Sequence, residues 1–465
     1  MKKIIYILIS LSVFQFTFTL NAEPLFNLKF KKYIGKISYY FTNQPLIYKN
    51  IIIYAGQGDK PTDDKYDRLT IYNSKGKELW SFPATSTTTK SSNIQGVVAD
   101  KERIYISSDN GIIYAVSLTG TIKWQFKTAG KVKAFTIGDI NNDGKNELLA
   151  GSWDHNLYAI SFTGSVIWKK DLLGAVDCSP IIFNKNKNIL IAVGSNAGGL
   201  FILNNKGETV DFFQAKDSVK SSPVIFYNKK GDDFRIIFGS DDGNLYILNK
   251  DFKRINKFKI KDRFISSPTL ADINNDGIPE IFISGDNKRF YGLTVSDNII
   301  LKKEFKTGIM ASPLLLKYKN KPVILLADLD GLIKLINLKG NTIWSYKTND
   351  MIFSTPAIGD PDYNGKVNFV VPSGDGYLYY FEASTSVITP IWSRWHGDNK
   401  GSGIYKNAIN FSSINITKSV IKTEKLTEES NKERLNYINK EKNDGFFNRI
   451  INCIKRILFS KEKIK

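Results

Sequence analysis

A Gly-x-x-x-Trp motif recurs along this chain at a nearly constant spacing, and this repeat constrains the fold more than any other feature. The motif ends at Trp80, Trp124, Trp168 and Trp344, and the first three tryptophans are 44 residues apart. A Ser-Pro or Thr-Pro pair runs in phase with it, beginning at Ser179, Ser222, Ser267, Ser312 and Thr355. Periods in the forties are typical of solenoids and propellers. The repeat therefore predicts one array of similar units.

Each unit has the pattern of four short strands. In the unit at 218–262, apolar runs at 224–226, 234–239, 245–248 and 255–260 alternate with turn sequences. The turn before the third run, Asp241-Asp242-Gly243-Asn244, contains residues that tolerate positive φ, as tight hairpins require. Short strands separated by such turns are typical of all-β folds.

We therefore predict an all-β fold, an eight-bladed β-propeller over residues 34–405, with seven blades and a decorated edge as the alternative. Closing the ring protects the edges of the sheets. The predicted blades are 34–82, 91–130, 131–174, 175–217, 218–262, 263–308, 309–350 and 351–398. One aromatic residue per blade is expected to pack between neighbours. These blade-docking aromatics are Trp80, Trp124, Trp168, Phe212, Phe258, Phe305, Trp344 and Trp392.

The N-terminus has the layout of a secretory signal. Lys2 and Lys3 precede an apolar run at 4–20, and a small residue follows, so residues 1–22 are predicted to be a signal peptide. An uncleaved anchor is the alternative. We expect an exported protein of the periplasm or envelope, so nucleic acid is not an expected partner despite the net charge of +20. No cysteine lies near the cleavage point, and a lipoprotein is not expected.

The C-terminal part differs in composition. Residues 412–444 are polar and predict a flexible linker. Residues 445–460 have apolar residues at helical spacing with basic residues on the other side, which predicts an amphipathic helix too short to span a bilayer. Its expected contacts are a membrane surface or a partner's groove, and folding back onto the propeller is the alternative. The residues are Phe446, Phe447, Arg449, Ile450, Ile454, Lys455, Arg456, Ile457 and Leu458.

The segment from Tyr114 to Trp124 is similar to the tryptophan-docking motif of the quinoprotein-like (PQQ-repeat) propellers, and Leu157 to Trp168 repeats it. Ser117 and Ser161 stand where the family usually has Asp. The resemblance covers about residues 34–405, and the sequence from Trp392 to Gly403 resembles the closing segment of such propellers.

The resemblance implies either a quinone-dependent dehydrogenase or a cofactor-free scaffold. A dehydrogenase of the family should show a catalytic Asp, Ca²⁺ inside the ring and, in many members, adjacent cysteines, whereas this chain has only Cys178 and Cys453. We therefore expect that this protein is not an enzyme and that it does not bind PQQ. The implied function is that of BamB-like members, a non-catalytic protein-binding scaffold of the cell envelope whose partners include the outer-membrane barrel assembly machinery.

Two loops predict structural Ca²⁺ sites. Oxygen ligands at alternate positions, a turning Gly and a closing Glu suit this hard cation, and the spacing resembles the loops of FG-GAP propellers. The residue at the seventh position of each loop would contribute its backbone carbonyl oxygen as a ligand. The alternative is a pair of Asx turns without an ion. The candidate ligands are Asp139, Asn141, Asp143, Lys145 and Glu147 in one loop and Asp272, Asn274, Asp276, Ile278 and Glu280 in the other. A degraded copy begins at Asp360.

These loops favour a second function, a calcium-stabilised extracytoplasmic adhesin or glycan-binding propeller. Trp153, beside Asp154 and His155, is the candidate residue for stacking on a sugar ring in this second function. His155 and His396 are far apart in sequence and have no converging partners, so we expect no acid–base or metal role for them.

Overall fold

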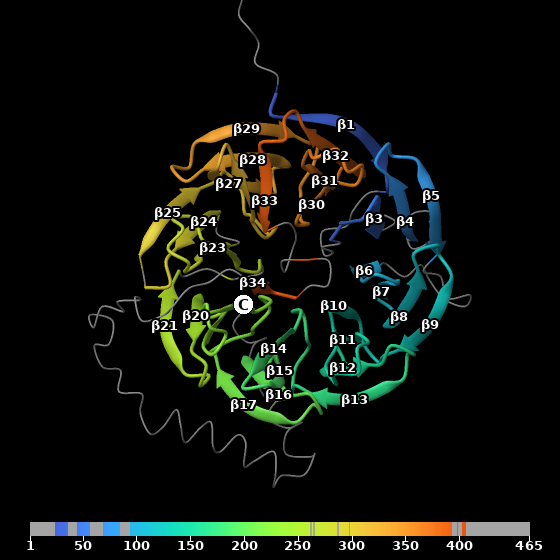
Figure 1. Ribbon diagram of the computed structural model, residues 1–465, viewed down its shortest axis with the longest axis vertical. Helices are drawn as coiled ribbons and strands as arrows, with labels where there is room; N and C mark the ends of the chain where they lie inside the picture. Colours follow the sequence, from blue (N-terminus) through green and yellow to red (C-terminus); the bar gives the residue numbers. More distant parts are fainter. Residues whose placement is uncertain are drawn as a thin grey trace, which may run out of the picture.

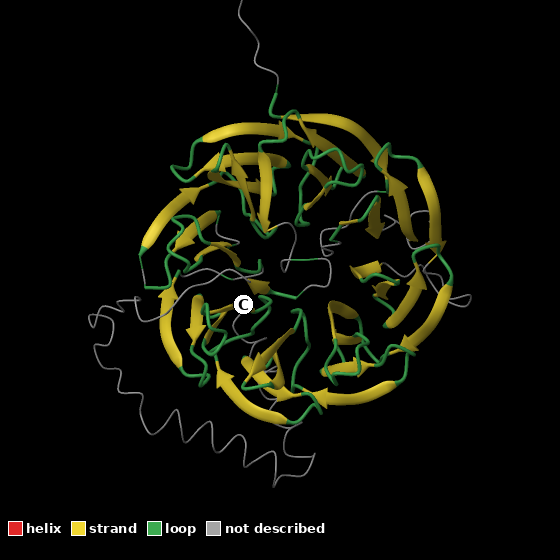
Figure 2. Ribbon diagram, in the orientation of Figure 1, coloured by secondary structure: helices red, strands yellow, loops and turns green. Residues whose placement is uncertain are grey.

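The repeats form eight sheets of antiparallel strands, one of which gains a parallel C-terminal strand, and the sheets are arranged in a closed ring, as Figure 1 shows for the computed structural model. The structure describes residues 24–35, 44–55, 68–83, 94–260, 263, 266–285, 288–296, 298–392, 398 and 402–405. All regular elements in these ranges are strands (Figure 2). The predicted all-β, eight-bladed propeller is confirmed, and the seven-bladed alternative is wrong.

Blades one to four follow chain order from the ring axis outward. Blade one has β2 (Leu46–Tyr48), β3 (Ile51–Ala55), β4 (Arg68–Asn73) and β5 (Glu78–Pro83). Blade two has β6 (Ile94–Ala99), β7 (Arg103–Ser108), β8 (Ile112–Ser117) and β9 (Ile122–Lys127). Blade three has β10 (Val132–Gly138), β11 (Glu147–Ser152), β12 (Asn156–Ile160) and β13 (Val166–Asp171). Blade four has β14 (Ile181–Lys185), β15 (Asn188–Ser195), β16 (Gly199–Asn204) and β17 (Thr209–Gln214).

Blades five and seven each have a fifth strand. Blade five has β18 (Val224–Tyr227), β19 (Phe234–Ser240), β20 (Asn244–Leu248), β21 (Arg254–Lys259) and β34 (Ile404–Tyr405). Blade six has β22 (Thr269–Ala271), β23 (Glu280–Ser284), β24 (Arg289–Leu293) and β25 (Ile299–Glu304). Blade seven has β26 (Leu314–Tyr318), β27 (Lys321–Ala327), β28 (Leu332–Asn337), β29 (Thr342–Lys347) and β33 (Ile388–Trp392). Blade eight has β30 (Ala357–Gly359), β31 (Asn368–Pro372), β32 (Tyr377–Ala383) and β1 (Phe26–Tyr33).

The N-terminal strand closes the ring. β1 pairs antiparallel with β32 and forms the outermost strand of blade eight, whose other strands come from the end of the repeat array. The propeller therefore begins at β1, before the start at residue 34 that the repeat predicts. The indole N–H of Trp344 in blade seven donates to the carbonyl of Phe26 at 3.2 Å. Both ends of the array are thus joined within one blade.

The last strands lie at the inner edges of two blades. β33 pairs antiparallel with β26, and β34 pairs parallel with β18. Figure 1 shows both near the middle of the ring. Trp392 lies opposite Leu315 on β26 and is 3% exposed. It was predicted to dock a blade from an outer strand, and this placement corrects that prediction, because the closing segment runs inside the ring.

The repeated motif is the joint between adjacent blades. The indole N–H of Trp124 donates to the carbonyl of Phe162 in the next blade at 3.0 Å, and Trp80 and Trp168 make equivalent bonds to Leu118 and Asn205. The next motif's Gly lies against each ring. A Cβ on Gly164 would come within 2.6 Å of Trp124. In these three joints, the Trp of one blade therefore packs against the Gly of the next blade.

Three predicted docking aromatics take other positions. Strand pairing places Asp211, Asn256 and Leu301 at the position of the Trp. Because side chains alternate along a strand, Phe212 points the other way and packs on Phe201 of its own blade at 4.8 Å between ring centroids. Phe258 and Phe305 lie two and four residues after the docking position. Asn256 keeps the joint by donating to the carbonyl of Val295 at 3.1 Å.

The predicted signal peptide at 1–22, the linker at 412–444, the helix at 445–460 and His396 lie outside the described residues. Within the described ranges, no helix has the length and apolar character needed to cross a membrane.

Candidate functional site

The two predicted calcium loops join the first and second strands of blades three and six. In the first loop, the Asp139 carboxylate accepts hydrogen bonds from the N–H groups of Asp143 and Gly144 at 3.2 and 2.9 Å. Asn141 accepts from Asp143, and Asp143 accepts from the N–H of Lys145. Buried Glu147 accepts from the N–H of Ile140 at 2.9 Å. The five predicted ligand residues are thus gathered in one turn by backbone hydrogen bonds.

The second loop repeats this pattern. Asp272 accepts from the N–H of Gly277 at 2.8 Å, Asp276 accepts from Ile278 at 2.7 Å, and Glu280 accepts from Ile273 at 3.0 Å. The Asn274 carboxamide donates to Asp276 at 2.9 Å and to Glu280 at 3.3 Å.

Two features set the second loop apart from the first. The Oδ1 atom of Asp272 is buried without a hydrogen-bond partner among the described residues. The N–H of Asp272 donates to the hydroxyl of Tyr405 at 3.0 Å, which ties the loop to the C-terminal strand.

Burial raises the pKa of Glu280 to about 7 and also raises the pKa of Glu147, because the ionised form loses hydration. The neighbouring Asp276 and Asp143 carboxylates raise these pKa values further. The donor atoms are the oxygens that Ca²⁺ prefers. Within the described ranges, however, no three His, Cys, Asp or Glu side chains are grouped closely enough to hold a metal ion. Calcium binding by these loops stays a prediction.

Trp153 lies in the turn between β11 and β12, at the end of the ring opposite these loops. Its side chain is 41% exposed, and its indole N–H donates to Asp177 at 2.7 Å. The ammonium groups of Lys131 and Lys133 lie 5.5 and 4.8 Å from the ring centroid. The polar neighbours of the ring are therefore these two lysines and Asp177.

The outermost strands of the blades carry exposed aliphatic side chains, and we call the surface formed by β5, β9, β13, β17, β21, β25, β29 and β1 the outer wall. The residues, each between 39% and 58% exposed, are Leu79, Ile122, Val166, Ile167, Val210, Ile299, Ile300 and Ile343. The same strands contain thirteen Lys or Arg and four Asp or Glu, whereas the whole chain has 65 and 45. The outer wall is therefore both apolar and basic.

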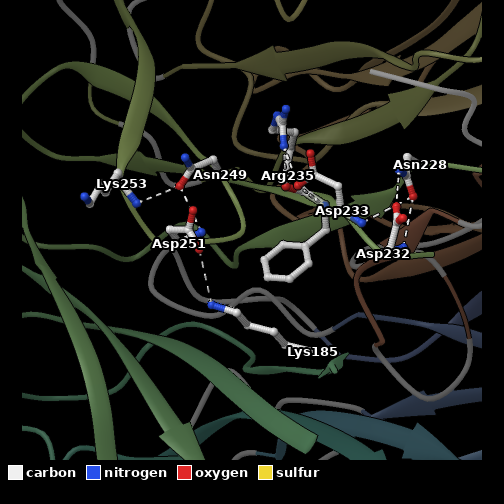
Figure 3. A network of polar contacts seen from close by, with 9 residues as sticks. Lys185, Asn228, Asp232, Asp233, Arg235, Asn249, Asp251 and Lys253 are labelled. Atoms are coloured by element: carbon white, nitrogen blue, oxygen red, sulfur yellow. Dashed lines mark hydrogen bonds and ion pairs between the residues drawn. The ribbon is translucent and has the colours of Figure 1, made fainter. Parts of the chain in front are cut away.

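Two hollows open between hairpin turns. The smaller, about 80 Å³, lies by the turns of blades four and five and includes Lys185, Asp232 and Asp251. Figure 3 shows that its charged groups have partners: Lys185 lies 3.7 Å from Asp251, which also lines the hollow, and Asp232 accepts a hydrogen bond from the neighbouring Asn228 at 2.6 Å. The larger, about 410 Å³, lies beside blade four and extends to Asn142 of blade three's loop.

Comparison with known proteins supports the propeller fold. Residues 103–232 match the family described as "Lambda-carrageenase beta-propeller domain". No curated protein matches the sequence. The structure is similar to BamB from Moraxella catarrhalis, with 14% identity, a TM-score of 0.56, and coverage of 76% of this chain and 98% of that one.

Two further solved structures show the same fold. The computationally designed Ika8 protein is 10% identical with a TM-score of 0.54, covering 76% of this chain and 99% of that one. The Dos1 propeller is 14% identical with a TM-score of 0.55, covering 76% and 95%.

The outer wall and the larger hollow were not among the sites predicted from the sequence. A recurring aliphatic residue one or two positions before the Trp position was a visible sequence signal for the outer wall. The hollow had no local signal, because its residues come from three separate turns and strands that only the fold brings together.

Proposed function

We propose that this chain is a non-catalytic binding propeller of the cell envelope whose outer wall docks protein partners. The observation that carries the proposal is the band of exposed aliphatic residues on the outermost strands, represented by Ile122, Ile167 and Ile343. Exposed apolar patches are typical of interaction sites, and the exposed aliphatic residues recur, one or two to a strand, on six of the outermost strands. Edge strands also offer backbone groups to which an extended segment can pair.

The charge of the outer wall specifies the partner's surface. Thirteen basic against four acidic side chains favour a partner that is acidic around an apolar centre. Lysines also protect edge strands from pairing with other copies, which keeps such a wall soluble between encounters.

The proposed envelope location rests on the predicted signal peptide at 1–22. It agrees with the structural similarity to BamB, although what the two proteins share is the fold. We propose envelope proteins as partners, with the outer-membrane barrel assembly machinery as the first candidate. In-cell crosslinking of tagged protein, followed by mass spectrometry, tests this. Barrel-assembly components as the main products are expected, and recovery of surface glycans alone, or of nothing reproducible, contradicts the proposal.

The predicted amphipathic helix at 445–460 supplies a membrane contact in this account. Its apolar side and its basic side, with Arg449 and Lys455, suit the surface of an anionic bilayer. Deleting residues 445–465 is expected to release the protein from membranes on fractionation. Unchanged fractionation contradicts this part of the proposal.

A second candidate is a calcium-stabilised glycan-binding propeller, and the match of residues 103–232 to a carrageenase propeller family favours it. The test is binding of λ-carrageenan oligosaccharides with and without chelator, in the native chain and in Asp143→Ala and Asp276→Ala variants. Loss of binding in chelator and in both variants is expected. Binding that ignores chelator and both substitutions contradicts the calcium part, and no binding by the native chain contradicts the function.

A further inference from the structure

Four of the polar side chains that line the larger hollow have no hydrogen-bond or ion-pair partner among the described residues. The hollow is bounded by the β10–β11 loop, the β14–β15 turn with the start of β15, and the β16–β17 turn with the start of β17. Its lining residues are Asn142, Lys187, Asn188, Ile189, Leu190, Asn204, Asn205 and Val210. Within the part of the chain that the structure describes, the side chains of Asn142, Lys187, Asn188 and Asn205 make no hydrogen bond or ion pair.

The backbone holds these side chains in place. Asn142 and Lys187 both have positive φ, 61° and 69°, at the tips of their turns. The carbonyl of Asn205 accepts the indole hydrogen bond of Trp168 at 2.9 Å, so its position is set by a blade joint. Asn204 differs, because its carboxamide closes the β16–β17 turn through Lys206 and Glu208. The lining side chains without hydrogen-bond partners are therefore attached to well-positioned backbone.

The chemistry of the lining selects a ligand class. A carboxamide has two donors and one acceptor oxygen, which matches hydroxyl groups that both donate and accept. Ile189, Leu190 and Val210 offer an aliphatic wall to a C–H face. Lys187 is the one charged residue of the lining, and its ammonium group suits a sulfate or carboxylate substituent. About 410 Å³ lies within the range of small-molecule sites, roughly 300–1,000 Å³.

We propose that this hollow binds an acidic saccharide unit, with the amides of Asn188 and Asn205 on its hydroxyls and Lys187 on its anionic group. The proposal rests on the second candidate function above and adds the site and the ligand class to it. All lining residues fall within 103–232, the segment that matches the carrageenase propeller family.

The test uses the full-length protein and calorimetric titration with λ-carrageenan oligosaccharides and their chemically desulfated forms. Lys187→Asn keeps a residue that tolerates positive φ and removes the charge. It is expected to weaken binding of the sulfated form about tenfold and to leave the desulfated form unchanged. Asn188→Ala and Asn205→Ala are expected to weaken both forms. The matched control is Lys206→Ala, an exposed lysine next to Asn205 that does not line the hollow.

The titrations distinguish an error in the proposed binding site from an error in the proposed glycan-binding function. If the native chain binds the oligosaccharides and Val210→Trp, which fills the hollow, binds equally well, the site proposal is overturned and glycan binding stands. Equal losses in Lys187→Asn and Lys206→Ala indicate diffuse attraction of a polyanion and also overturn the site. No binding by the native chain overturns both. Thermal unfolding of each variant, expected within about 3 °C of the native value, shows that the ring is intact.

Discussion

The hydroxyl of Ser222 accepts a hydrogen bond from the backbone N–H of Ser179 in the preceding blade, at 2.9 Å. The same bond repeats from Ser222 to Ser267, from Ser267 to Ser312 and from Ser312 to Thr355, at 2.8–3.2 Å. All five residues are at most 3% exposed. The Ser-Pro marker of the sequence is therefore a chain of hydrogen bonds joining five consecutive blades.

Removing one hydroxyl from this chain should destabilise the ring. In Ser222→Ala, the N–H of Ser179 stays buried without a partner, which costs about 1–3 kcal/mol of unfolding free energy. Denaturant unfolding measures the change. Ser345→Ala, on the exposed side of β29, is the control and should change stability by less than about 0.5 kcal/mol. Equal stability of the two variants would show that the chain of bonds is dispensable.

A comparison of two glycines distinguishes the cost of backbone strain from the cost of disturbing the contact between blades. Gly164 and Gly144 have φ of 92° and 82°, but a Cβ on Gly164 meets Trp124 at 2.6 Å and one on Gly144 meets nothing within 4 Å. Gly144→Ala is expected to lose about 1 kcal/mol from backbone strain, and Gly164→Ala at least about 1 kcal/mol more from the clash. Thermal melts compare them. A Gly164→Ala protein as stable as Gly144→Ala contradicts the docking role.

Ring closure depends on Phe26. Its ring packs edge-on against Trp344 and Phe369, with centroids 5.4 and 4.9 Å away, and is 2% exposed. Phe26→Ala should cost about 3–5 kcal/mol. Leu28→Ala, two residues along β1 and 38% exposed, is the control and should be much milder. Comparable losses in denaturant unfolding would argue against closure through this strand.

The repeat predicted the number and order of the blades because glycine, tryptophan and turn residues each have a direct structural role. It did not predict β1, since this strand precedes the first Gly-x-x-x-Trp motif and pairs with a strand more than 340 residues away. It also misassigned Phe212, because a shift of one residue moves a side chain to the other face of a strand. The position is marked by Asp211, four residues after Gly207, and not by the nearest aromatic residue.

The candidate sites were less predictable than the fold. The residue spacing located the loops at Asp139 and Asp272, because hydrogen bonds between residues close in sequence form their turns. The hollow between Asn142 and Asn205 depends on the distance between two blades, which no local pattern encodes.

Glu280 should make stability depend on pH. Burial raises its pKa in the folded protein from 4.5 to about 7, so the folded state holds the proton more tightly than the unfolded state. Its contribution is complete below pH 4.5 and is lost as the pH rises to about 7. Thermal melts across this window should therefore fall less steeply in Glu280→Gln than in the native chain. An unchanged slope would contradict the role of Glu280.

The most direct test of the proposed function is site-resolved photo-crosslinking in cells. A photoreactive residue is placed at Ile122, Ile167 or Ile343 on the outer wall, and at Tyr363, which is 70% exposed on a loop away from it, as the control. We predict the same envelope-protein adduct from the wall positions and none from Tyr363. Adducts from Tyr363 alone, or no protein adduct at any wall position, would contradict the central claim that the outer wall docks protein partners.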